Sequence, residues 1–310
     1  MTTSLTGARL MLRSFLRLSM ILIFFMTPGI SFSQEFTLGG INYSYYPSTG
    51  IKEANSDRKV LLEEKEIFAN IPLQFNDGKM TLINGFKFGV LSPQIENNTL
   101  QNDERDLYHI GYSLSLIQAF DNDWLALAIL SPSISSDFKG VDSINDFSEQ
   151  LLFQGSLLFQ KTVHDGYKYG FGGLYTSKFG SPLLLPLAQL SYKKDRLTFD
   201  ALIPAKIGLY YDFSRKKFTA GLQVAVDGGE YEILDTINNP SIETVRFSQI
   251  NFGPKLEYRL TGPIHFSLST GLSTNRKFEF ALDNDNSADV SPESNFFLSL
   301  GLSIKPILNK

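Results

Sequence analysis

The sequence predicts an all-β protein, an antiparallel up-and-down transmembrane β-barrel of about 12–14 strands, on three observations. Apolar side chains alternate with small or polar ones, short turns alternate with long loops, and the first 33 residues resemble an export signal. The alternation has a period of two residues, which a strand can keep and a helix cannot. A short turn next to a long loop is the arrangement of strands that run up and down through a membrane.

The two-residue alternation is clearest in five segments. In residues 108–120 large apolar side chains take most even positions, while His, Gly, Ser and Ala occur among the odd positions. The same pattern returns in residues 80–90, 218–226, 264–272 and 296–304. A strand with one apolar face fits a barrel wall, and it also fits one sheet of a β-sandwich. The alternation by itself leaves both folds open.

Residues 1–33 have the features of a signal peptide. Three arginines and no acidic residue precede or accompany the apolar run 18–26. This run is shorter than the roughly 20 residues that a helix needs to cross a bilayer. We therefore expect residues 1–33 to be cleaved and residues 34–310 to form a single outer-membrane barrel domain. A retained membrane anchor is the alternative.

The composition supports the same class of protein. The chain has 28 Lys and Arg against 32 Asp and Glu, a formal net charge of −4, so a nucleic-acid partner is not expected. It has no cysteine, which excludes disulfides, thiolate metal sites and lipid attachment to a cysteine. No segment after the leader approaches the length of a membrane helix, so membrane residence requires a closed barrel.

Connections of two lengths alternate along the chain. Short polar turns are expected at residues 76–79, 121–123, 164–166, 193–196, 214–217 and 261–262. Longer polar loops are expected at residues 47–58, 92–105, 135–148, 177–182, 228–243 and 283–294, with a brief link at 203–206. This predicts short periplasmic turns and longer extracellular loops, whereas Greek-key crossings in a sandwich would not alternate in this way.

Aromatic residues gather beside the short turns. Aromatic rings settle where hydrocarbon meets lipid headgroups, because they combine an apolar body with a polarisable edge. The alternative is the aromatic core of a sandwich. The predicted aromatic girdle consists of Phe75, Phe120, Trp124, Tyr169, Tyr192, Phe199, Phe213, Phe218, Tyr258 and Phe266.

Two kinds of feature count against a regular barrel. Pro72, Pro186 and Pro254 lie within predicted strands, and a closed barrel has no edge where a missing N–H is harmless. They are interpreted as bulges or local breaks. The segments 184–192 and 197–203 are barely as long as the roughly 9–11 residues that a tilted strand needs. Twelve strands is therefore an alternative to fourteen.

A motif in the centre of the chain is similar to a known family. It begins with Pro-Leu-Leu-Leu-Pro-Leu at residues 182–187, continues through Leu-Ile-Pro at 202–204, and ends with Ile-Gly-Leu-Tyr-Tyr at 207–211. These residues resemble an uncharacterised family of Gram-negative outer-membrane β-barrels whose function is unassigned. The resemblance implies a fold and a location, and it carries no catalytic residues.

The register opposite to the large apolar residues is expected to line the barrel interior. Charges there are tolerated when they pair or meet water. We expect Lys206 to pair with the two aspartates of the set and the three alternating charges at 255–259 to pair across strands, which would brace the wall. The alternative is a solute-selective lining. The candidates are Lys87, His109, Asp200, Lys206, Asp212, Lys255, Glu257 and Arg259.

Signals for catalysis and metal binding are weak. His109 and Ser113 lie about 13 Å apart along one strand, which excludes a local pair, although a histidine–serine pair across strands stays open. Residues 283–289 resemble the start of a calcium loop. They lack the glycine at the sixth position, and Ser294 stands where a glutamate is expected. No catalytic residue, metal site or cofactor is predicted.

These features together predict a passive pore, or a barrel that binds small solutes or lipid, without catalytic activity. The alternatives are a non-conducting structural or adhesive barrel and a secreted β-sandwich binding module. The expected partners are outer-membrane lipid, the barrel-assembly machinery during biogenesis, and a small solute.

Overall fold

The computed structural model describes residues 36–52, 57–96, 106–138, 151–213, 217–234, 242–282 and 287–306. All of them belong to one compact unit, Ser33–Pro306. The predicted signal peptide lies outside the described residues, as do parts of several predicted loops. Among the described residues, no helix is long and apolar enough to cross a membrane.

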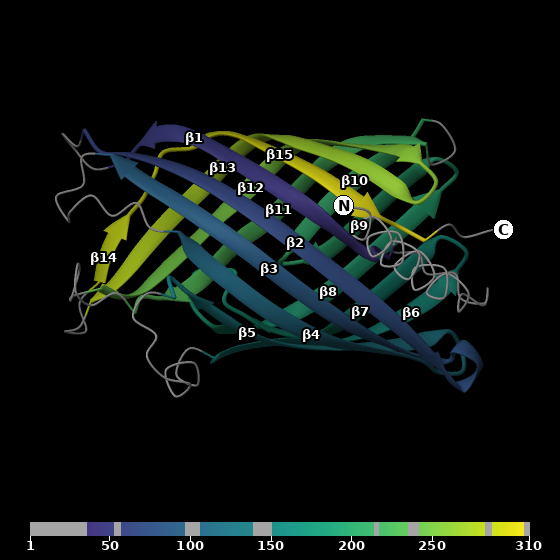
Figure 1. Cartoon of the computed structure of the whole chain (residues 1–310). Helices are drawn as coiled ribbons and strands as arrows, with labels where there is room; N and C mark the ends of the chain where they lie inside the picture. Colours follow the sequence, from purple (N-terminus) through teal and green to yellow (C-terminus); the bar gives the residue numbers. More distant parts are fainter. Residues whose placement is uncertain are drawn as a thin grey trace, which may run out of the picture. The chain divides into compact units, whose positions relative to one another are not determined.

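The unit is a closed antiparallel barrel of 14 strands (Figure 1). The ring closes because β1 pairs with β15, β15 with β13, and β13 with β12. The short β14 pairs with β13 and adds no strand to the ring. The predicted barrel is therefore confirmed, with fourteen strands and not twelve. The strands are β1 (Gly39–Gly50), β2 (Lys59–Phe75), β3 (Met80–Glu96), β4 (Leu107–Ala119), β5 (Trp124–Ser136), β6 (Leu151–His164), β7 (Tyr167–Thr176), β8 (Leu183–Lys194), β9 (Leu197–Ile203), β10 (Lys206–Asp212), β11 (Phe218–Glu232), β12 (Ile242–Thr261), β13 (Ile264–Leu282), β14 (Ser287–Val290) and β15 (Asn295–Ile304).

The two ends of the barrel differ. The turn end, on the right in Figure 1, carries the short connections such as the single 3₁₀ turn Asn76–Gly78 between β2 and β3. The first and last strands also meet there, since the Leu38 N–H donates to the Ile304 carbonyl at 2.7 Å. The predicted long loops connect strands at the opposite end, here called the loop end, and the brief β9–β10 link points in the same direction. Asp77 and Gly78 both adopt positive φ, as a tight turn requires.

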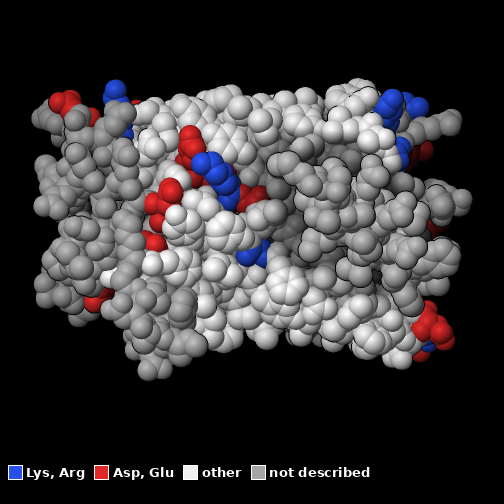
Figure 2. All heavy atoms as spheres, in the orientation of Figure 1, with Lys and Arg blue, Asp and Glu red and all other residues white. Residues whose placement is uncertain are grey.

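The outer face is apolar over a broad belt. Large hydrophobic side chains are half exposed there, including Ile67, Phe86 and Leu222 at 53% each, and in a water-soluble protein such residues would be buried. Figure 2 shows a face that is mostly uncharged between its two ends, with one charged patch toward the loop end. On β2 the outward residues are apolar from 67 to 75. The next two outward residues toward the loop end are Lys65 and Glu63, which form an ion pair with an N–O distance of 3.5 Å. Nine residues of a tilted strand match an apolar band of about 25 Å.

The wall is uneven in height. β12 and β13 have 20 and 19 residues, whereas β9 and β10 have seven each. Seven residues tilted by about 40° rise about 18 Å, which is less than the apolar band of a typical barrel. The short segments therefore do form strands, and they make one low side of the barrel. Several predicted loops were wrong in extent, because β1 continues to Gly50, β3 to Glu96 and β11 to Glu232. The short strand β14 lies within the predicted loop 283–294.

The strand prolines lie where no hydrogen bond is lost. The backbone N–H of Asn70 donates to the Leu38 carbonyl, on the side of β2 that faces β1. Backbone N–H groups of every second residue point to the same side of a strand, so the nitrogen of Pro72 also points to this side, beyond the start of β1, where no strand is paired. By the same alternation, the nitrogen of Pro186 points past the end of β9. Pro254 falls in a gap of the β12–β13 ladder. The uneven strand ends and this one local break make the prolines compatible with closure.

At the loop end, β11 crosses toward the far wall. Glu232 pairs with Ser136 of β5 in a parallel bridge, and the Leu234 N–H donates to the Asp137 carboxylate at 3.1 Å. The β7–β8 loop packs against the same part of β11. A Cβ atom at Gly228 would come within 2.3 Å of the Lys178 carbonyl oxygen, so only glycine allows this contact.

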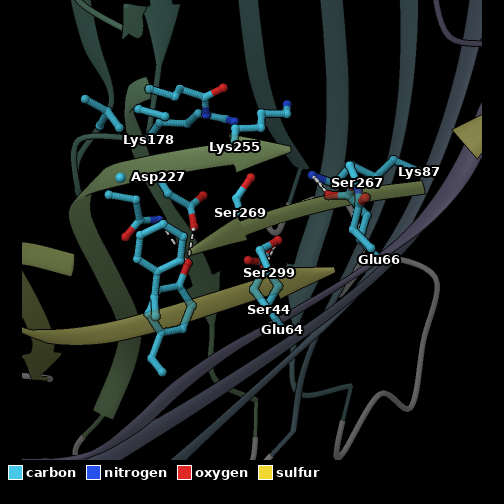
Figure 3. Close-up of a pocket in the computed structure, with 18 residues that line it drawn as sticks. Ser44, Glu64, Glu66, Lys87, Lys178, Asp227, Lys255, Ser267, Ser269 and Ser299 are labelled. Atoms are coloured by element: carbon cyan, nitrogen blue, oxygen red, sulfur yellow. Dashed lines mark hydrogen bonds and ion pairs between the residues drawn. The ribbon is translucent and has the colours of Figure 1, made fainter. Parts of the chain in front are cut away.

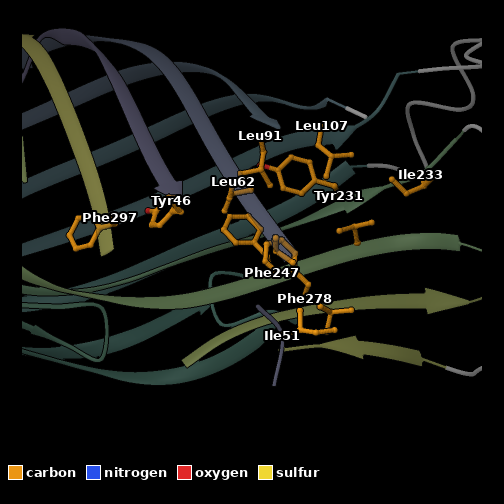
Figure 4. Packing of buried hydrophobic residues seen from close by; sticks show 13 residues of the cluster. Tyr46, Ile51, Leu62, Leu91, Leu107, Tyr231, Ile233, Phe247, Phe278 and Phe297 are labelled. Atoms are coloured by element: carbon orange, nitrogen blue, oxygen red, sulfur yellow. The ribbon is translucent and has the colours of Figure 1, made fainter. Parts of the chain in front are cut away.

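A hydrophobic cluster, here called the plug, fills the space beneath the crossing strand (Figure 4). It joins inward side chains of β1–β4 to inward side chains of β11–β13 and β15. Tyr231, Phe247 and Phe278 form a continuous stack, with ring centroids 6.3 and 6.0 Å apart. The packing ties two opposite walls of the barrel together. The plug consists of Tyr46, Ile51, Val60, Leu62, Leu91, Leu107, Tyr231, Ile233, Val245, Phe247, Phe278, Val290 and Phe297.

Candidate functional site

A polar cavity of about 300 Å³, here called the lumen cavity, lies inside the barrel next to the plug. Tyr46 and Phe297 belong to both, so the plug forms one wall of the cavity. A second space of about 330 Å³ shares Asn42, Glu66 and Lys87 with it and continues past Asn70 toward the turn end. The lining residues come from β1–β3, β11–β13, β15 and the β7–β8 loop.

Small inward side chains make room for the cavity. Ser267 and Ser269 of β13 face Gly301 and Ser299 of β15, and Ser44 of β1 donates to the Ser299 hydroxyl at 3.0 Å. Because the inward positions along these stretches are Ser and Gly, their inner face leaves the lumen open. The alternation seen in the sequence is thus the direct cause of the space.

Six charged side chains line the lumen cavity (Figure 3). Lys87 and Glu66 form an ion pair between β3 and β2, at one end of the view, and Asp227 and Lys178 lie toward the other end. Three carboxylates and three ammonium groups make the set formally neutral. The set is Glu64, Glu66, Lys87, Lys178, Asp227 and Lys255.

Asp227 is held in place by neighbours from three strands. Its carboxylate accepts hydrogen bonds from the Gly228 N–H at 3.0 Å, the Gln249 amide at 3.4 Å and the Tyr46 hydroxyl at 3.5 Å. The Asn251 amide donates in turn to the Tyr46 oxygen at 3.0 Å. This network fixes one carboxylate at the boundary between plug and cavity.

The predicted lumen residues all take inward positions in the strand registers, but they do not form one group. Lys87 and Lys255 line the lumen cavity. His109 faces inward on β4, opposite Gly89. Asp200 and Lys206 lie on the low side of the barrel, in β9 and β10. The remaining three, Asp212, Glu257 and Arg259, lie near the turn end.

The predicted pairing of these charges was wrong in part. The ammonium of Lys206 lies 5.7 Å from the Tyr210 ring centroid and makes no ion pair within the described residues. Asp212 is six residues away along the same strand, about 20 Å in an extended chain, which is too far for a pair. Glu257 does pair across strands, but with His265 at 2.9 Å and Lys305 at 2.5 Å.

A histidine–serine contact across strands does form. His109 Nδ1 lies 2.8 Å from the Ser135 hydroxyl. Ser135 is only 2% exposed, and no carboxylate contacts the other ring nitrogen among the described residues. A catalytic pair needs an accessible nucleophile and a base oriented by a third group. The contact therefore has the features of a structural hydrogen bond.

Arg276 is a buried cation inside the plug region. Its side chain is 2% exposed, its guanidinium carbon lies 5.8 Å from the Tyr46 ring centroid, and none of its three side-chain nitrogens has a hydrogen-bond partner in the described chain. A cation–π contact compensates only part of the cost of burying a charge. The plug residue Tyr46 therefore packs against a cation whose burial is only partly compensated.

The predicted girdle residues take outward register positions at the turn end. Trp124 packs edge-on against Tyr169 with ring centroids 6.4 Å apart, and Phe213 lies 5.5 Å from Phe218. Leu114, one of the large apolar residues at even positions of 108–120, is also on the outer register and is half-buried.

Several site residues were not found by sequence reasoning. Glu64 and Glu66 belong to Glu-Glu-Lys-Glu, where charges occupy both faces and the alternation disappears. The signal that could have found them is their even numbering, because the even positions of this strand, such as Phe68 and Asn70, face the interior. Lys178 falls in a predicted loop, and Asp227 immediately precedes one, so neither was assigned to the interior. In the part of the chain that the structure describes, no group of three His, Asp or Glu residues is placed to hold a metal ion.

Comparison with known proteins identifies the family. The model of a family described as "Domain of unknown function (DUF6268)" matches residues 30–305, so the chain belongs to this family. The resemblance of the central motif to an uncharacterised family is thus confirmed. No curated protein matches the chain.

Three solved structures with a similar fold are distant from this chain in sequence. An outer membrane channel from Pseudomonas putida F1 has 13% identity and a TM-score of 0.47, covering 90% of this chain and 99% of that one. The monoaromatic hydrocarbon channel TodX has 8% identity and a TM-score of 0.38, with 86% and 89% covered. LpxR from Salmonella typhimurium has 10% identity and a TM-score of 0.36, with 86% and 99% covered.

Proposed function

We propose that this member of the family is an outer-membrane channel that binds small hydrophilic solutes in its lumen and is closed at the loop end by the plug. The observation that carries the proposal is the polar, charged lumen cavity directly beneath a hydrophobic seal. A cavity with six charged side chains suits hydrated polar molecules better than a lipid or hydrocarbon.

The outer face supports a location in the outer membrane. A belt of half-exposed Leu, Ile and Phe side chains requires an apolar surrounding, and outward aromatic residues at the turn end suit the membrane boundary. We place the turns in the periplasm and the loops outside the cell. Export through the predicted leader, insertion by the barrel-assembly machinery and contact with outer-membrane lipid are part of the same proposal.

The plug supports a gated channel more than a permanently open pore. It spans from β1–β4 to β11–β13, and the crossing strand β11 is tied to β5 by Glu232–Ser136 and Leu234–Asp137 contacts. Arg276, a buried cation beside the plug residue Tyr46, lacks a hydrogen-bond partner in the described chain, which lowers the stability of the closed arrangement. A seal that is well packed but electrostatically strained is suited to opening.

A non-enzymatic role agrees with the His109–Ser135 contact. The buried serine and the missing third group argue against acyl transfer. The second candidate function is a non-conducting structural or adhesive barrel, and the plug is the observation that favours it.

The test is conductance and solute uptake with the purified full-length protein. In planar bilayers we expect long closed periods with discrete openings, and in liposomes slow uptake of small sugars and amino acids. Substitution of Asp137 by Ala should increase the open fraction, because it releases the end of β11 from β5. A protein that stays silent, with and without this substitution, and whose liposomes stay impermeable, would leave the structural or adhesive role.

A further inference from the structure

The two spaces inside the barrel meet at three polar side chains, here called the junction. Asn42 of β1, Glu66 of β2 and Lys87 of β3 line both the lumen cavity and the second space toward the turn end. Residues that line two neighbouring spaces lie at the boundary between them. A solute that moves between the lumen cavity and the turn end therefore passes these three side chains.

Glycines beside the junction let its side chains meet. Asn42 and Glu66 lie directly opposite each other on β1 and β2. On the other side of β2, Glu66 faces Gly89, so Lys87, two residues earlier on β3, reaches Glu66 along the diagonal. A Cβ atom at Gly301, the partner of Asn42 on β15, would come within 2.7 Å of the Asn42 side-chain oxygen. Glycine at these two positions therefore leaves the space that the three side chains occupy.

Glu66 is fixed by its contacts, whereas Lys87 has N–H donors to spare. One carboxylate oxygen of Glu66 accepts a hydrogen bond from the Asn42 amide at 3.2 Å, and the other is paired with the Lys87 ammonium (Figure 3). Among the described residues the ammonium pairs only with Glu66, and an ammonium carries three N–H groups. The side chain of Lys87 is 41% exposed, against 18% for Glu66. Since Lys87 faces inward, its exposed part meets the water of the lumen.

We infer that Lys87 determines which solutes cross the junction: its ammonium binds the anionic group of a passing solute, and Glu66 holds the ammonium in place. This inference rests on the proposed function and names its solute class, small molecules that carry a carboxylate or another anionic group. An exposed ammonium with unused N–H groups attracts anions and donates charge-assisted hydrogen bonds to them. The neighbouring carboxylate weakens this attraction, which lets a bound anion leave again.

The experiment measures charge selectivity in planar bilayers. The purified full-length protein separates potassium chloride solutions of different concentration, and the reversal potential of its openings gives the ratio of chloride to potassium permeability. A second series uses potassium acetate, so that a carboxylate is tested as well. We expect the unsubstituted protein to favour both anions over potassium. Lys87→Gln should lower the ratio about fivefold and Glu66→Gln should raise it by a similar factor, since a unit charge a few ångströms from an ion in water changes the ion's population about fivefold.

Matched controls separate the junction from the rest of the barrel. Glu63 and Lys65 form an ion pair on the outer face of β2, so Glu63→Gln and Lys65→Gln should leave the permeability ratio unchanged. Lys87→Arg keeps the positive charge and should keep the preference for anions, whereas a loss of stability alone would not move the ratio. If Lys87→Gln fails to give a folded, heat-modifiable barrel, Glu66→Gln tests the junction with a shift of the opposite sign.

The outcomes separate this inference from the proposed function. Openings whose permeability ratio is the same in the unsubstituted protein, Lys87→Gln and Glu66→Gln would overturn the role of Lys87 and leave the channel standing. A preference of the unsubstituted protein for potassium, or an equal shift in Lys65→Gln, would overturn it as well. A barrel without openings would remove the channel and this inference together. Opposite shifts in Lys87→Gln and Glu66→Gln, with none in the outer-face controls, support both.

Discussion

Substitution of Phe247 by Ala should open the channel. Phe247 is 3% exposed, and its ring lies between those of Tyr231 and Phe278 in the stack at the centre of the plug. Removing a buried Phe side chain costs about 3–5 kcal/mol, from lost burial and from the cavity left behind. If the open state does not contain this stack, the cost falls on the closed state alone.

The size of the expected effect follows from this cost. A shift of about 3 kcal/mol between closed and open states changes their ratio by roughly 100-fold, since 1.4 kcal/mol corresponds to a factor of ten. A channel that is open for a small fraction of the time would then be open for most of it. The assay is the open fraction in planar bilayers, with the urea concentration of unfolding measured in parallel.

The matched control is Phe252→Ala. Phe252 lies on the same strand, β12, but faces outward and is 47% exposed. It loses contact with lipid and leaves the plug intact, so its open fraction should match that of the unsubstituted protein. The reasoning is refuted if Phe247→Ala lowers stability as calculated while the open fraction stays the same, because the plug would then not close the passage.

Three further substitutions test the register, the ion pair and the strand prolines. Leu268→Arg, on the lipid-facing register, should lower the free energy of unfolding by about 2–4 kcal/mol, whereas Ser269→Arg should mainly reduce conductance; equal destabilisation would show that the register is wrong. Lys87→Gln should lower the free energy of unfolding in urea by about 1 kcal/mol, because the ion pair with Glu66 is partly exposed. Adding Glu66→Gln should restore part of this loss, because it removes the carboxylate left without its partner; strictly additive effects of the two substitutions would show that the pair is not coupled. Pro72→Ala should change the free energy of unfolding by less than about 1 kcal/mol in the same assay, because the nitrogen at position 72 faces no partner strand. A clear gain in stability would indicate that the N–H of the alanine finds an acceptor, so that proline does cost the wall a hydrogen bond.

The outer surface of the barrel could be predicted well because it depends on local pattern. On strands such as 264–272, each apolar residue is separated from the next by one small or polar residue, and this fixes the two faces whatever the neighbours are. Turn residues with positive φ, such as Asp77 and Gly78, then fix where the hairpins fall. The barrel class, its short-turn end and its lipid-facing register follow from these two signals.

The site could be predicted only in part. Lys87 and Lys255 lie on strands with clear alternation, so their inward direction was visible in the sequence. Glu64 lies where the alternation is lost, and Lys178 lies in a loop, whose path depends on contacts with β11. Which inward charges meet depends on strand order, strand tilt and register around the whole ring, and none of these is a local property.

The sequence by itself determined that this chain forms an antiparallel membrane barrel, because a two-residue period and alternating connection lengths are properties of neighbouring residues. Only the tertiary structure decided that a hydrophobic cluster packs across the inside of the barrel near the loop end. Asp137 and Leu234 are 97 positions apart, and Tyr46 reaches Asp227 across 181 positions. Contacts over such separations form when the ring closes and the end of β11 meets β5, so the plug and the cavity next to it exist only in the folded barrel.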